Sequence, residues 1–308
     1  MEPTRSPDRD HGAKGNALVE GRAADRLRAG GGKGTLDSSA APGQAFRRSR
    51  RSTRDPEPMR SVEEFRSAYR ALEQRMKALA EAEGDFFLPN PEPQGPVEYV
   101  LICMEPSLGR WARSAEKARS RVDSGFRNFI FSIEDFILHF CARRYLCRGL
   151  EQRYHITDLS KGAMLVERAR IARAKRYDRW YALLEEELEL LSSAETGFVA
   201  VGKKVSEHLA RRGFSKPLTP IIHYSGQAAA TRKAGIIGRE ADYESFKASV
   251  SLDELITNAK DVLLQADVPD EIRDETLTRL TKSRLSESRR QLIFNYKTSF
   301  DSLRLRVA

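Results

Sequence analysis

The sequence predicts an α/β fold: a three-layer α/β/α arrangement around a central four-stranded parallel sheet, with helical additions at both ends. Four short apolar segments bounded by turn residues indicate buried strands, at 99–103, 154–159, 198–202 and 219–223. Longer segments with helical spacing separate them. Strands that alternate with helices favour a parallel sheet with helices on both faces. Proline within the fourth segment indicates an edge strand, because proline cannot donate to a central ladder.

The N-terminal part is predicted to hold two further regions. Residues 1–58 are rich in Gly, Ser, Pro, Asp and Arg and should form a disordered basic tail. Residues 59–96 should form a helix followed by a proline-rich linker. Ser61 and Glu64 have the spacing of a capping box, and the helix should end near Gly84.

The α/β domain is predicted to span residues 97–239, and a C-terminal helical extension 240–308. Within the extension, a capping box at Ser251 begins one helix, and a second should run from near Asp270 through Tyr296. An acidic cluster at 185–189 is expected on a helix away from the strand ends.

Composition excludes several classes of protein. No window approaches 18 consecutive apolar residues, and no apolar leader is present, so we expect neither a membrane span nor an export signal. The three cysteines lack metal-ligand spacing and should be reduced thiols of a cytoplasmic protein, with no metal. The net charge of +9 is compatible with a polyanionic partner.

Polar and titratable residues follow all four predicted strands, and parallel strands bring their carboxyl ends to one edge, where ligands bind in open α/β sheets. These residues are Glu105 and Ser107; Asp158, Ser160 and Lys161; Gly202, Lys203 and Lys204; and His223, Ser225 and Gly226. Residues 110–127 carry six basic and two acidic side chains, and 203–216 carry five and one. This excess indicates either a path for a phosphate backbone or ordinary solvated helices.

Over residues 97–238 the chain resembles a divergent member of the uracil-DNA glycosylase superfamily. Cys-Met-Glu-Pro-Ser at 103–107 is similar to the G-Q-D-P-Y or G-E-A-P-G motif after the first strand, with proline in register. Ile-Thr-Asp at 156–158 resembles I-T-N, and Val-Ala-Val-Gly at 199–202 the apolar third strand. His-Tyr-Ser at 223–225 takes the place of H-P-S.

The resemblance implies a DNA glycosylase that flips a damaged or deaminated base out of the stack. Glu105 would activate water, and His223 would donate to the leaving base. Asp158 would read the edge of the base, and Phe129 would stack on it. Residues implied to hold DNA phosphates are Ser107, Ser160, Lys161, Ser225, Gly226, Arg232 and Lys233. DNA is the implied partner, and no cofactor is implied.

Three positions depart from the family pattern: Cys103, Asp158 and Tyr224. An ionised carboxylate only accepts hydrogen bonds, so Asp158 would suit a base with an amino group better than uracil. Phe129 lies in a helical apolar stripe, where core packing is the alternative. Asp158 is equally suited to cap a helix.

Two other functions stay open on the sequence. One is a catalytically inactive nucleic-acid-binding module on the same fold. The other is an unrelated α/β domain that binds a small phosphorylated ligand. A monomer is expected, with the C-terminal helices available to a protein partner.

Overall fold

The computed structural model describes residues 61–106, 108, 114–148, 153–164 and 173–307. The basic tail predicted for 1–58 and the phosphate contact predicted for Ser107 both lie outside the described residues. Pro58–Ala308 forms one compact unit. No helix in the described part of the chain is long and apolar enough to cross a membrane.

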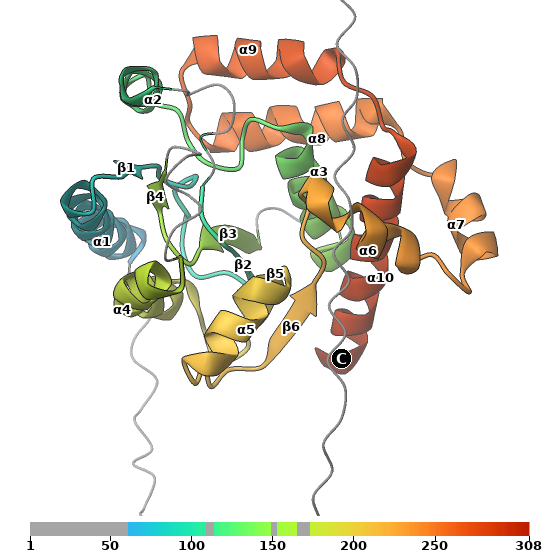
Figure 1. Ribbon diagram of the computed structural model, residues 1–308, viewed down its shortest axis with the longest axis horizontal. Coiled ribbons are helices and arrows are strands. Elements are labelled where there is room, and N and C mark those ends of the chain that lie inside the picture. Colours follow the sequence, from blue (N-terminus) through green and yellow to red (C-terminus); the bar gives the residue numbers. More distant parts are fainter. Residues whose placement is uncertain (1–60, 107, 109–113, 149–152, 165–172, 308) are drawn as a thin grey trace, which may run out of the picture. The chain divides into compact units, whose positions relative to one another are not determined.

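The centre of this unit is a four-stranded parallel sheet, as the sequence predicts (Figure 1). Its strands are β2 (Tyr99–Cys103), β3 (Tyr154–Asp158), β5 (Gly197–Val201) and β6 (Leu218–Ile221). Their order is β3-β2-β5-β6, so β6 is an edge strand, and it carries Pro220 as expected. The strands begin or end within two residues of the predicted positions.

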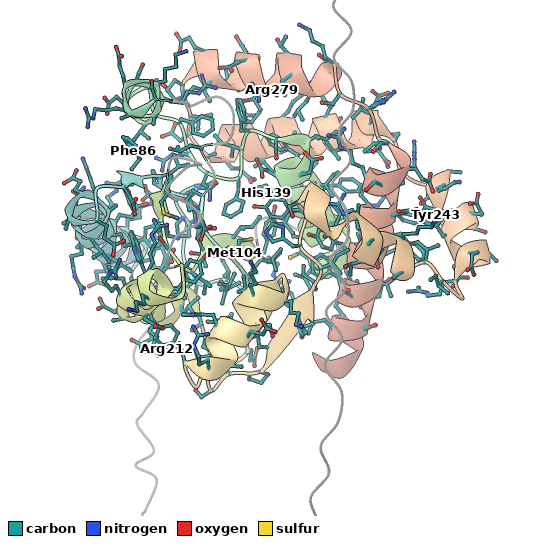
Figure 2. All side chains as sticks on the ribbon, viewed as in Figure 1. Phe86, Met104, His139, Arg212, Tyr243 and Arg279 are labelled. Carbon is teal, nitrogen blue, oxygen red and sulfur yellow. The ribbon has the colours of Figure 1, made fainter. Side chains whose placement is uncertain are left out.

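Apolar side chains cover both faces of the sheet, because successive strand residues point to opposite sides. Leu101 and Val199 belong to a core cluster shared with α3 (Ile133–Cys141), α8 (Leu252–Gln265) and α10 (Glu287–Val307). Val100 and Phe198 belong to a second cluster, shared with α1 (Val62–Ala82), α4 (Arg173–Leu191) and α5 (Lys203–Arg211). Figure 1 shows these two groups of helices on either side of the sheet, and side chains fill the spaces between them (Figure 2).

The predicted N-terminal helix is confirmed as α1, with Ser61 and Glu64 forming the capping box. The following linker runs along the outer edge of β3. Asn90 Nδ2 donates to the Ile156 carbonyl at 3.0 Å, and Leu88 N–H donates to the Lys161 carbonyl at 3.0 Å. On the same side of the unit, β1 (Phe86–Phe87) pairs with β4 (Gly162–Ala163) in a small antiparallel sheet. The sequence does not predict this pair.

Between β2 and β3 the described chain forms α2 (Ala115–Asp123), α3 and a π-helical turn, η2 (Ala142–Leu146). The segment after β6 forms a 3-10 turn, η4 (Gly226–Ala228), then α6 (Ala229–Ala234) and α7 (Glu240–Lys247).

The C-terminal prediction needs one correction. The single helix expected from Asp270 through Tyr296 is two helices, α9 (Asp270–Thr281) and α10, separated at 282–286. The Ser283 hydroxyl donates to the Arg279 carbonyl, and a new helix begins where Ser286 accepts from later backbone N–H groups. The C-terminal helices α8, α9 and α10 contribute Leu255, Leu280 and Leu292 to the same core cluster as the sheet, so they are an integral part of the fold.

Candidate functional site

The parallel register brings the polar strand ends to one edge of the sheet. Cys103 pairs with Asp158 in neighbouring strands, so the segment after β2 begins beside the last residue of β3. Glu105, two residues further on, contributes to the electrostatic environment of Asp158. Its carboxylate accepts a hydrogen bond from the Tyr177 hydroxyl on α4. The structure therefore brings Glu105 and Asp158 to the same edge of the sheet, close enough to interact electrostatically.

Asp158 is the most strongly perturbed group of the site. It is 2% exposed, and its Oδ2 accepts from Asn128 Nδ2 at 2.8 Å. Its Oδ1 is buried and has no hydrogen-bond partner among the described residues. Burial raises the pKa of Asp158 to about 8, and the negative charges of Glu187 and Glu105 add to this effect. At pH 7 the side chain is therefore mostly a neutral acid, with a hydroxyl to donate.

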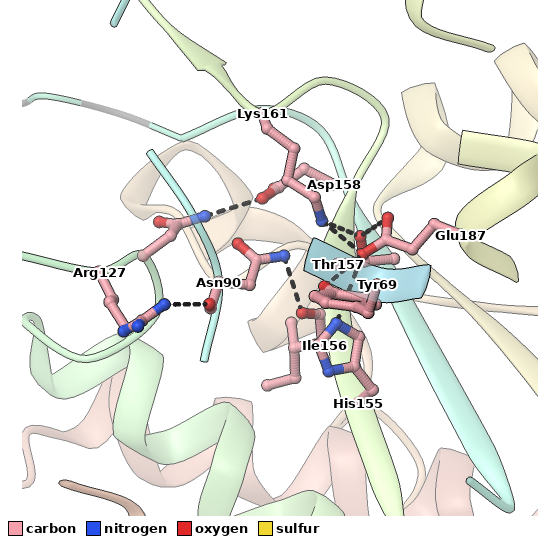
Figure 3. A network of polar contacts seen from close by, with 10 residues as sticks. Tyr69, Asn90, Arg127, His155, Ile156, Thr157, Asp158, Lys161 and Glu187 are labelled. Carbon is pink, nitrogen blue, oxygen red and sulfur yellow. Dashed lines mark hydrogen bonds and ion pairs between the residues drawn. The ribbon is translucent and has the colours of Figure 1, made fainter. Parts of the chain in front are cut away.

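A buried ion pair lies next to Asp158 (Figure 3). Lys161 Nζ lies 2.8 Å from Glu187 Oε1, and the two side chains are 1% and 0% exposed. The Tyr69 hydroxyl donates to Glu187 Oε1 at 2.9 Å, and the Thr157 hydroxyl donates to Oε2 at 2.7 Å. Burial alone would raise the pKa of Glu187, but the charge of Lys161 and its hydrogen bond to the carboxylate lower it below the usual value. Glu187 is therefore ionised.

This ion pair changes two predictions from the sequence. Lys161 is buried against Glu187, so its ammonium is not available to a DNA phosphate in this conformation. Glu187 was expected on a helix face away from the strand ends, but it lies beside the end of β3. His155 Nε2 is 3.6 Å from Glu187 Oε1, too far for a hydrogen bond.

The end of β6 holds His223 in one orientation. The backbone N–H of Ser225 donates to His223 Nδ1 at 2.9 Å, so the proton of the neutral ring lies on Nε2. Burial, together with the positive charge of Arg232, lowers the pKa of His223. Its ring stacks on Tyr224 with the ring centroids 4.6 Å apart. Gly202 also approaches the ring so closely that a Cβ at this position would lie 3.1 Å from His223 Cδ2. The imidazole is thus a positioned, neutral hydrogen-bond donor.

Two predicted contact residues serve the interior instead. Arg232 is 3% exposed, and its guanidinium donates to the Ser225 carbonyl at 2.7 Å and to Ser288 Oγ at 3.0 Å. It ties the segment after β6 to α10, so in this conformation its guanidinium is engaged within the protein. Phe129 is 2% exposed within the main core cluster, which is the packing alternative that the sequence left open. Its φ of 59° is unusual for a bulky residue.

The remaining predicted phosphate contacts differ in exposure. Ser160 is fully buried, Ser225 is partly buried, and Gly226 and Lys233 are exposed. Gly226 and Lys233 therefore remain the described candidates for a phosphate at the surface.

Sequence reasoning missed three residues that shape the site: Asn128, Tyr177 and Glu187. A signal existed for Glu187, which lies three residues after Leu184 and four before Leu191 and so falls on the apolar face of α4. Tyr177 lies on the same apolar face, four residues before Tyr181 and seven before Leu184, but this spacing does not reveal its contact with Glu105. No comparable signal marks Asn128, which meets Asp158 only through the tertiary fold.

Within the described ranges, no group of three His, Cys, Asp or Glu side chains could hold a metal ion. All three cysteines are buried and free. A scan against protein-family models gives no match, and neither the curated proteins nor the solved structures contain a significant match to the chain.

Proposed function

We propose that the protein is a DNA N-glycosylase that hydrolyses the glycosidic bond of a flipped, damaged or deaminated base. One observation carries the proposal: two carboxyl groups in different environments meet at the carboxyl edge of a parallel sheet. Glu105 is partly buried and accepts a hydrogen bond from the Tyr177 hydroxyl, whereas Asp158 is fully buried and its pKa is raised. Paired titratable groups whose environments differ in this way are typical of acid–base and hydrolytic sites.

The state of Asp158 changes the substrate that the sequence favours. A neutral carboxylic acid has both a hydroxyl donor and a carbonyl acceptor, as an amide has. Oδ2 already accepts from Asn128, which leaves Oδ1 to donate. Because Oδ1 is buried, a base binds there only when the segments that cover Asp158 move. A base with a carbonyl group at that edge, such as uracil, then fits Asp158 better than a base with an amino group.

In the proposed reaction Glu105 positions and activates the attacking water and stabilises the positive charge that develops on the sugar. The Nε2–H of His223 donates to the oxygen of the leaving base, where negative charge develops. A glycosidic bond inside the DNA stack is inaccessible, so the nucleotide must first be extruded.

Several broader features belong to the same proposal. The clusters on the two sheet faces support a three-layer α/β/α arrangement. The excess of positive charge supports binding to a phosphate backbone. A monomer in the cytoplasm is inferred from the sequence alone.

The test is release of a free base from oligonucleotides that carry uracil, hypoxanthine, xanthine or a mismatch. Wild-type protein should leave an alkali-labile abasic site in at least one of them. Glu105→Gln should abolish turnover, and Asp158→Asn should keep it, because the amide reproduces the donor and acceptor of the neutral acid.

A second candidate is an inactive nucleic-acid-binding module. It is favoured by Cys103 and Tyr224, which replace a glycine and a proline of the motifs that this chain resembles. Salt-sensitive DNA binding without release of any base would support this candidate.

A further inference from the structure

The buried polar cluster at the end of β3 contains two fully buried carboxyl groups, Glu187 and Asp158, and one ammonium group, Lys161. Lys161 Nζ lies 2.8 Å from Glu187, whereas the hydrogen bond to Asp158 comes from the neutral amide of Asn128. The single cation is thus associated with Glu187 (Figure 3).

The hydrogen bonds show the same asymmetry between the two carboxyl groups. Glu187 receives donors from Lys161, Tyr69 and Thr157, which together satisfy both of its oxygens. Asp158 receives one donor at Oδ2, and its buried Oδ1 meets none among the described residues. Two buried anions beside one cation would leave an uncompensated charge at low dielectric, which is costly. The proton therefore stays on Asp158.

Charged and titratable groups reach Asp158 from several elements. They are Lys161 just after β3, Glu187 on α4, Glu105 after β2, Cys103 on β2 and Tyr224 after β6. Among them Lys161 alone is positively charged and favours an ionised Asp158. Glu73 on α1 also interacts electrostatically with Lys161, but the ion pair that Lys161 forms among the described residues is with Glu187, 2.8 Å away. The pairing of Lys161 with Glu187 thus decides the state of Asp158.

We propose that Glu187 is a specificity-determining positioning residue: by binding the ammonium of Lys161, it keeps Asp158 a neutral acid. Without the charge of Glu187, the ammonium would pair with Asp158, and the proton of Asp158 would be released to solvent. The strand end would then offer an acceptor in place of a donor. The consequence for base recognition rests on the proposed function, but the consequence for the charge of Asp158 does not.

The direct test is Glu187→Gln, which removes the charge and retains an oxygen for the Tyr69 or Thr157 hydroxyl. The side-chain carboxyl ¹³C shift of Asp158, followed by NMR against pH, should give a midpoint about 1–3 pH units below that of wild type. Glu186→Gln is the matched control, because Glu186 lies on the same helix in a partly exposed pair with Arg75. It should leave the midpoint unchanged.

The double variant Lys161→Met/Glu187→Gln removes both charges and tests the same idea if the single variant does not fold. Asp158 should then titrate near or above its wild-type midpoint, since no cation favours its ionised form. A midpoint unchanged in the single variant, or lowered in the double variant, would overturn the proposal.

A measurement of base release separates this inference from the proposed function. Glu187→Gln should reduce the release of carbonyl-bearing bases relative to amino-bearing ones. If the midpoint of Asp158 falls as expected but no variant releases a base, the glycosylase proposal fails and the role of Glu187 stands. If bases are released while the midpoint does not move, the role of Glu187 fails alone.

Discussion

The buried acid Asp158 should make the stability of the protein depend on pH in a range where few other groups titrate. Its pKa is about 8 in the folded protein, against 3.8 for the unperturbed group. Between these values the folded state holds a proton that the unfolded chain has lost. The contribution of Asp158 to stability is therefore full below its unfolded pKa and is lost as pH rises through its folded pKa.

The expected magnitude follows from this linkage. At pH 7 about nine-tenths of the folded molecules carry the proton, and at pH 8 about half do. Integrating between the two gives a loss of about 1 kcal/mol in the free energy of unfolding. For a chain of this size, that corresponds to a melting temperature lower by roughly 2–4 °C.

The assay is urea unfolding at pH 7.0, 7.5 and 8.0 on wild-type protein and Asp158→Asn. The amide cannot ionise but can still accept from Asn128, so this variant should lose most of the pH dependence. The pKa of Glu73 is raised by burial to about 7, and its residual slope should appear equally in both proteins. Equal slopes for wild type and variant would refute the assignment of the buried proton to Asp158.

Three further substitutions test other parts of the structure by urea unfolding at fixed pH. Gly202→Ala places a Cβ at φ 103° and 3.1 Å from His223, and should cost about 1–3 kcal/mol; wild-type stability would contradict the close approach. Asn90→Ala removes the donor to the Ile156 carbonyl and should lower the free energy of unfolding by about 1–3 kcal/mol. Amide hydrogen exchange in β3 should become faster, and unchanged exchange would show that the linker does not protect that edge. Ser61→Ala breaks the capping box of α1 and should cost about 1 kcal/mol, and a loss of helicity should accompany it; a neutral effect would mean that packing alone fixes that end.

Much of the sheet is predictable from the sequence because its strands are short apolar runs that end at turn residues. Proline in β6 even identifies an edge strand. The break between α9 and α10 is not predictable in this way. The segment 282–286 has neither glycine nor proline, and the apolar spacing continues across it. The hydroxyl of Ser283 donates to a helical carbonyl there, which serine also does inside unbroken helices, so the sequence pattern does not show that the helix ends.

The sequence predicts which polar residues stand at the strand ends, but it does not predict which of them are buried or in which protonation state they are. Parallel strands ensure that Glu105 and Asp158 meet at one edge. The state of Asp158 depends on its burial, on the ion pair between Lys161 and Glu187, and on Asn128. Lys161 looks like a surface residue in the sequence because it follows a strand end, yet its ammonium is buried against a helix from a later segment. Such pairings join distant segments, and no local pattern reveals them.

The central claim is that the edge formed by Glu105 and Asp158 cleaves a glycosidic bond. The most direct measurement is release of free base from a panel of modified-base oligonucleotides by wild-type protein and by Glu105→Gln. The account predicts that wild type releases a carbonyl-bearing base and that the folded variant does not. Absence of release from every substrate, or equal release by both proteins, would contradict it.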